Sequence, residues 1–153
     1  MSETKKTIIR FLCFAATMVM LLLLVYLYFY LESEGSYAYR AIDCKALQWS
    51  FPEHSFDTES GREWNSLRIY ALNTAKMEEL LAFAGSNAWK PLPLTDSEKD
   101  DAFLKDYPDQ NISSMKEAQQ GYWNSIMQKG RRYLCVIDAQ NARLYIRSSS
   151  ILE

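Results

Sequence analysis

The chain has 153 residues, 14% of them aromatic, with 17 Lys and Arg against 19 Asp and Glu. That aromatic content excludes a wholly disordered chain, and the length predicts one folded domain plus an N-terminal segment. A net charge of −2 without a concentrated basic face predicts no nucleic-acid partner.

The N-terminal segment is a largely apolar run from residue 8 to residue 31, in which Arg10 is the one charged residue. As a helix this run would measure about 36 Å, against a hydrocarbon core of about 30 Å. We therefore predict a transmembrane helix over residues 8–31, with a modest tilt. Aromatic residues suited to the headgroup level gather at its far end: Tyr26, Tyr28, Phe29 and Tyr30.

The charges that flank this helix predict its orientation. Lys5, Lys6 and Arg10 lie at its start, and Glu32 and Glu34 follow it. Positive flanks stay in the cytoplasm, so residues 1–10 are the expected cytoplasmic tail of a single-pass cell-membrane protein whose C-terminal domain is outside. A cleaved signal peptide stays open as an alternative, because residues 36–38 form a small-x-small site, although signal peptides have shorter apolar regions.

The first half of the outer domain shows strand and loop patterns. Residues 32–40 are expected to be a polar linker, and residues 41–153 the globular domain. Alternating apolar residues predict a strand over 46–51, which Pro52 ends. Residues 53–63 are polar and predicted to form a loop, and alternation returns in a second strand over 64–72.

A helix and an extended segment follow. Apolar residues at helical spacing predict a helix that Asn73 or Thr74 caps and Gly85 ends. Two alternating prolines then exclude a helix over 89–94. We expect this segment to be extended and anchored in the core by its large apolar side chains: Trp89, Leu92 and Leu94.

Two capping boxes predict two further helices. Residues 95–98 predict a short acidic helix to about Lys105, and residues 114–117 a helix towards Lys129. Gly121 weakens the second prediction.

The C-terminal region predicts a β-hairpin. Residues 133–137 are apolar on both faces, residues 138–141 are typical of a turn with Asn141 in the left-handed region, and residues 143–147 alternate. The expected fold class is α+β: the N-terminal transmembrane helix and a small antiparallel sheet of about four strands, with two or three helices packed on one face.

The order of these motifs resembles a loose set of uncharacterised small bacterial proteins, extracytoplasmic and membrane-anchored, frequent in Firmicutes. The matching residues are His54-Ser55-Phe56-Asp57, Trp89 to Leu94, Gly121-Tyr122-Trp123, and Val136-Ile137-Asp138 through Leu144-Tyr145. Thr58, Glu59 and Ser60 stand where that set has glycines. The resemblance implies a fold and an outer location but no activity. It also implies an alternative interpretation of residues 121–123, as the start of a strand instead of the middle of a helix.

Three cysteines are present, of which Cys13 lies in the predicted membrane helix and Cys44 and Cys135 in the outer domain. An oxidising exterior permits a disulfide between Cys44 and Cys135, and two buried unpaired thiols are the alternative. No CxxC motif or nearby His accompanies either cysteine, so the sequence predicts neither a redox nor a metal role for them.

The candidate chemical residues are few. His54, Asp57 and Glu59 lie within six positions in the expected loop and suit a metal site or an acid–base pair, but polar loops commonly contain such residues. We expect no catalytic residue, no cofactor and no metal. The leading expectation is a non-enzymatic domain that binds the lipid bilayer through its helix and a protein or another envelope component outside. The alternatives are an envelope hydrolase that uses His54, Asp57 and Glu59, and a sensing or accessory subunit of a membrane complex.

Overall fold

The computed structural model describes residues 3–60, 63–99, 109–128 and 130–151, and has the predicted α+β class. A long N-terminal helix precedes one antiparallel sheet of six strands in the order β1-β2-β6-β5-β4-β3. The sheet is therefore larger than the four strands expected from the sequence.

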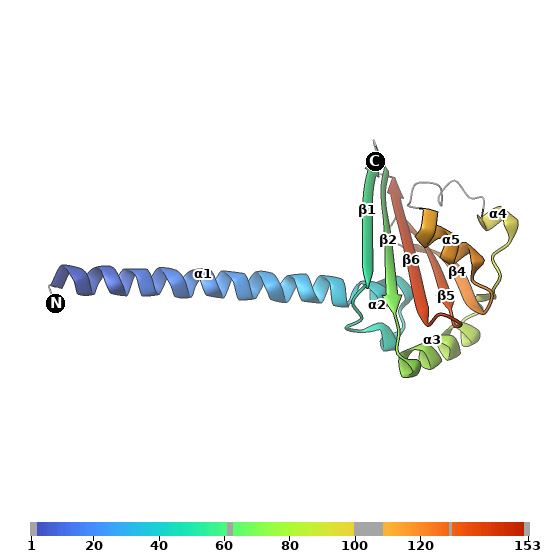
Figure 1. The fold of residues 1–153 in the computed structure, drawn as a ribbon, viewed down its shortest axis with the longest axis horizontal. Helices are drawn as coiled ribbons and strands as arrows, with labels where there is room; N and C mark the ends of the chain where they lie inside the picture. The colour runs from blue at the N-terminus through green and yellow to red at the C-terminus, as the bar shows by residue number, and fades with distance from the viewer. Residues whose placement is uncertain (1–2, 61–62, 100–108, 129, 152–153) are drawn as a thin grey trace.

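Helix α1 spans Glu3–Gly35 and projects away from the folded domain, with the N-terminus at its free end (Figure 1). Its apolar side chains are exposed along the whole predicted span. Among the described residues, this is the one helix long and apolar enough to cross a membrane. The domain does not cover α1, so its apolar surface needs lipid or another partner.

The junction after α1 is helical, although a linker was predicted over residues 32–40. Helix α2, Tyr37–Ile42, begins directly after Ser36, and a short 3-10 helix, η1, covers Lys45–Leu47. The predicted strand over residues 46–51 is wrong. Trp49 has φ of 55°, a left-handed conformation outside the range of a regular strand.

The predicted loop over residues 53–63 is also wrong, because it contains an edge strand. Strand β1, His54–Ser60, pairs antiparallel with β2, Glu63–Ala71. The second predicted strand is thereby confirmed. A polar strand is physically reasonable at this position, since an edge strand pairs on one side only and is protected by polar side chains.

Helix α3, Thr74–Ser86, confirms the predicted helix and its N-terminal cap: the Asn73 side chain accepts a hydrogen bond from the Lys76 amide at 2.9 Å. The helix ends one residue beyond Gly85, with Asn87 as its C-terminal cap. The segment after it is extended and includes the two-residue strand β3, Lys90–Pro91. Its three predicted anchors are buried, but they lie in different clusters: Trp89 packs on one face of the sheet, and Leu92 and Leu94 on the other. Residues 89–94 therefore cross from one face of the sheet to the other at the edge that β3 forms.

Of the two capping-box predictions, one is confirmed in part and the other is wrong. Helix α4, Asp96–Lys99, starts where predicted, and Glu98 Oε2 accepts from the Thr95 amide at 3.1 Å; its expected continuation to Lys105 lies outside the described residues. Helix α5 covers Asp109–Glu117 and does not continue towards Lys129.

Strand β4, Gly121–Gln128, replaces the end of that predicted helix and confirms the alternative interpretation of residues 121–123. Gly121 has φ of 131°, and a Cβ there would lie 1.9 Å from the Ile137 carbonyl oxygen. Only glycine fits this close approach of two strands.

The C-terminal hairpin is confirmed, with β5 at Arg131–Asp138 paired to β6 at Arg143–Ile151. The Asp138 carboxylate accepts from the amides of Gln140 and Asn141, both at 3.1 Å, which fixes the turn. The left-handed residue is Ala142, with φ of 51°, and not Asn141 as expected.

The sheet is covered on both faces, so the prediction that the helices pack on one face is wrong. Helices α2 and α3 with η1 pack on one face, and α5 with the 92–94 segment packs on the other. The first cluster includes Leu47, Tyr70, Leu80, Ile137 and Ile146, and the second Leu67, Met115, Trp123, Val136 and Tyr145. Both faces are largely apolar because both are buried.

Candidate functional site

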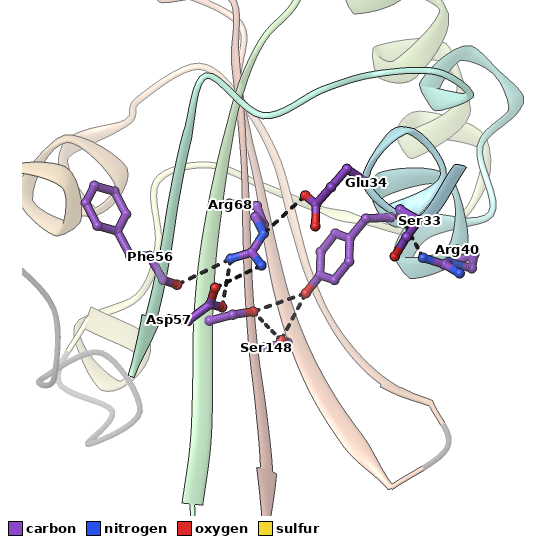
Figure 2. Close-up of polar contacts among 9 residues, drawn as sticks. Ser33, Glu34, Arg40, Phe56, Asp57, Arg68 and Ser148 are labelled. Carbon is purple, nitrogen blue, oxygen red and sulfur yellow. Dashed lines mark hydrogen bonds and ion pairs between the residues drawn. The ribbon is translucent and has the colours of Figure 1, made fainter. Parts of the chain in front are cut away.

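A charged cluster lies where the end of α1 meets the sheet, and Arg68 of β2 is at its centre (Figure 2). Arg68 donates from Nη1 and Nη2 to the two carboxylate oxygens of Asp57 on β1, at 2.9 and 3.2 Å. Its Nε lies 3.9 Å from Glu34 Oε2, in the last turn of α1. The Arg68 guanidinium thus links the edge strand β1 to the C-terminal end of α1.

Tyr37, the first residue of α2, extends this cluster to the central strands. Its hydroxyl lies 3.2 Å from Ser66 Oγ and 3.0 Å from Ser148 Oγ, and the two serine hydroxyls are 2.7 Å apart. The Arg68 Cζ atom lies 5.5 Å from the centre of the Tyr37 ring. Because Ser66 is on β2 and Ser148 on β6, this tyrosine fixes α2 over the middle of the sheet.

The electrostatics of the cluster follow from its burial. Burial alone would lower the pKa of Arg68, but the hydrogen bond and charge of Asp57, with Glu34, outweigh it and raise that pKa. Burial raises the pKa of the Tyr37 phenol, which the bonds from Ser148 and Ser66 only partly offset. Burial likewise raises the pKa of Tyr70 well above its ordinary value. Arg68 stays charged and both phenols stay neutral at physiological pH.

A pocket of about 500 Å³ opens beside Tyr37, between α2 and the ends of β4 and β5. Three phenols, two guanidiniums, one carboxylate and one amide line it: Tyr37, Tyr39, Arg40, Asp43, Gln128, Arg131 and Tyr133. This volume is within the usual range of small-ligand sites.

The lining suits recognition of a polar ligand. Two guanidiniums against one carboxylate leave a net positive charge, and guanidinium groups bind carboxylate or phosphate oxygens through paired hydrogen bonds. The Arg131 Cζ atom lies 5.1 Å from the centre of the Trp64 ring, which holds this side chain over an aromatic surface. The phenols add flat apolar area with a polar tip.

Of the three candidate residues of the predicted loop, His54 and Asp57 are not brought together, and the side chain of Glu59 lies outside the described part of the chain. His54, Asp57 and Glu59 all lie on β1, where side chains alternate between the two faces of the sheet. His54 is therefore on the opposite face from Asp57, and Asp57 is already bound to Arg68. Among the residues whose side chains are described, no group of His, Cys, Asp and Glu is placed to hold a metal ion.

Cys44 and Cys135 are both buried in the cluster of α2 and α3, and both are free thiols in this structure. Burial raises the pKa of each thiol, so neither is a ready nucleophile. Cys13 is exposed on α1.

Sequence reasoning missed Arg68, Tyr37 and the pocket. A signal existed in strand β2: Leu67 and Ile69 mark one apolar face, while Ser66 and Arg68 put polar groups on the other. Two polar side chains on a buried strand face require polar partners above them. Arg68 donates to Asp57 of β1 and lies near Glu34 of α1, and Ser66 bonds to Tyr37 of α2 and Ser148 of β6. Two of these four partners, Glu34 and Tyr37, come from the segment that was predicted to be a linker.

The chain matches no protein-family model, no curated protein and no solved structure. The site geometry and the topology of the chain therefore carry the functional argument.

Proposed function

We propose that this is a single-pass membrane protein whose C-terminal domain is an extracytoplasmic binding module. Helix α1 supplies the anchor, with an exposed apolar surface that only a bilayer or a neighbouring helix can cover. Its flanking charges favour a cytoplasmic N-terminus and an outer domain. The resemblance to small extracytoplasmic membrane-anchored bacterial proteins agrees with this location.

The observation that carries the binding role is the pocket lined by tyrosine and arginine. It lies between α2 and the ends of β4 and β5, and α2 directly follows the anchor helix. A protein segment or another envelope component that offers carboxylate or phosphate oxygens and flat apolar surface would fit this lining.

The test is site-specific photocross-linking of the full-length protein in cells. A photoreactive amino acid replaces either Gln128, which lines the pocket, or Met127, the preceding residue on β4. Met127 is 69% exposed and lies on the other face of the sheet. We expect a partner adduct from position 128 and not from position 127. Arg131→Glu, which reverses one charge of the lining, should reduce that adduct.

Two results would contradict the binding role of the pocket. One is a set of adducts that is the same at both positions, which would show only random collisions. The other is an adduct from position 128 that Arg131→Glu leaves unchanged. Since Arg131 and Gln128 are both exposed, neither replacement disturbs the core.

A second candidate role, as the sensing or accessory subunit of a membrane complex, has one specific contact in its favour. Arg40, a pocket residue, donates from Nη2 to the Ser33 carbonyl oxygen of α1 at 2.8 Å (Figure 2). A ligand that moves Arg40 would therefore disturb the end of the helix. Cross-linking between α1 helices with and without the partner would separate a sensor from a passive binder.

A further inference from the structure

Two aromatic side chains stay exposed on the folded domain, at the point where it meets α1. Trp49 is 60% exposed and Phe51 is 47% exposed, in the loop between η1 and β1. Both rings pack against Gly35, the last residue of α1: a Cβ at Gly35 would lie 3.1 Å from Trp49 Cε3 and 3.1 Å from Phe51 Cζ. The two rings thus form one apolar surface that continues from the end of the helix.

This loop is fixed to the domain from within. Leu47 is fully buried in the core, and Ser50 is buried and accepts from Lys76 Nζ of α3 at 2.8 Å. The left-handed backbone at Trp49 turns its side chain away from that core. Because Leu47 and Ser50 are held inside, Trp49 and Phe51 stay outside.

The contacts with Gly35 also set the depth of the two rings. The charge-free run ends at Leu31, and Gly35 lies four residues further, which is about 6 Å along a helix. The headgroup layer on each side of the hydrocarbon core is about 5–7 Å thick. Trp49 and Phe51 therefore lie at headgroup level if α1 spans the membrane as proposed.

We infer that Trp49 and Phe51 insert into the headgroup layer of the leaflet on the side of the domain, and hold the domain against the membrane surface. This inference rests on the proposed membrane anchoring. Aromatic side chains with an apolar ring favour that layer. The exposed charges near the pair in the sequence have both signs, with Asp43 and Lys45 before it and Glu53 after it, so an anionic lipid is not needed and phosphatidylcholine should suffice.

Tryptophan quenching in phosphatidylcholine nanodiscs tests this contact, because all 4 tryptophans lie outside α1. The full-length protein is placed in discs whose acyl chains carry bromine near the headgroup end or near the methyl end. We expect quenching of the wild-type protein, stronger with bromine near the headgroup. Trp49→Phe, which keeps an aromatic ring, should lose most of that quenching, and Met127→Ser, a change of an exposed apolar residue on β4, should retain it.

Equal quenching in the wild-type protein and Trp49→Phe would overturn the inference, as would a Trp49 signal that acrylamide in the water quenches and brominated lipid does not. A failure of the anchor is distinguishable from these results. In that case, alkaline carbonate would extract the protein from membranes, or its mass would show cleavage near residue 36. A protein that resists extraction but shows no contact of Trp49 with lipid would refute the lipid contact alone.

Discussion

Tyr37 and Tyr70 show how two similar buried phenols can differ in their effect on stability. The Tyr37 hydroxyl has two serine partners, whereas the Tyr70 hydroxyl is buried without a hydrogen-bond partner among the described residues. A paired hydroxyl adds net stability, and an unpaired buried one has lost its hydration without compensation. The same substitution should therefore have different results at the two positions.

We predict that Tyr37→Phe lowers the free energy of unfolding by about 1 kcal/mol at neutral pH, and that Tyr70→Phe leaves it unchanged or raises it. Ser66 and Ser148 keep their mutual bond in Tyr37→Phe, which limits the loss. Thermal unfolding of the full-length protein in detergent, followed by tryptophan fluorescence, measures both. A larger loss for Tyr70→Phe would show that its hydroxyl has a partner.

The same phenols predict a loss of stability at alkaline pH. Their folded-state pKa values are raised above the ordinary value of 10.0, so the unfolded chain ionises first as the pH rises. The unfolded state then binds fewer protons, and stability falls above about pH 10. Tyr70→Phe removes one contributor, so its loss between about pH 8 and about pH 11 should be smaller than that of the wild-type protein. An unchanged slope would contradict the assignment.

At the scale of elements, the sequence predicted those whose pattern has a single interpretation. Strand β2, helix α3 and the β5–β6 hairpin combine clear periodicity with a cap or turn residue. The apolar residues 118, 122 and 126 led to the wrong prediction of a helix towards Lys129. Their spacing of four fits one face of a helix, but it also fits one face of a strand. Gly121 decides between these two interpretations only through its contact with Ile137, a distant residue.

The polar edge strand and the apolar loop were missed for a related reason. Strand prediction from sequence takes an alternation of apolar and polar residues as the sign of a half-buried strand. Strand β1 is polar and lacks this sign, whereas Trp49 and Phe51 alternate with Ser50 and yet both lie exposed in a loop. Arg68 could have been suspected from strand β2 alone. Its partners Glu34 and Asp57 lie on two other elements, so the candidate site could not be assembled before the fold.

The position of residues 89–94, which cross the edge of the sheet at β3, depends on side-chain burial, because few backbone hydrogen bonds hold this segment. Trp89 is 7% exposed and packs with α3. We predict that Trp89→Ala lowers the free energy of unfolding by about 3–5 kcal/mol. His54→Ala, an exposed change on the edge strand β1, should stay within about 0.5 kcal/mol. Thermal unfolding of the two variants in detergent compares them directly.

Either of two results would alter this view of the segment and of β1. A small effect of Trp89→Ala would mean that the segment is held by other contacts than its tryptophan. A stable His54→Ala protein that loses partner cross-linking from position 128 would place a functional residue on the face opposite the pocket.

At the scale of the whole molecule, the anchor and the domain form one continuous structure. No flexible linker separates them, because α1 runs to Gly35 and α2 begins two residues later. The contacts of Glu34, Tyr37 and Arg40 fix the domain at the end of the helix. The pocket and the pair Trp49 and Phe51 thus keep defined positions relative to α1.

This arrangement makes the orientation of α1 decisive for function, and its flanking charges predict it. We expect alkaline phosphatase fused to the C-terminus to be active, since it works only outside the cytoplasm, and a fluorescent protein that folds only in the cytoplasm to be dark there. A variant that combines Lys5→Ser, Lys6→Ser and Arg10→Ser with Glu32→Lys reverses the charge bias across the helix, and should shift part of the population to the opposite pattern. It leaves Glu34 and its contact with Arg68 in place, so a change in reporter activity reflects insertion rather than misfolding. A wild-type C-terminus that reports from the cytoplasm would put the pocket on the inner side of the membrane, and the partner would then have to be cytoplasmic.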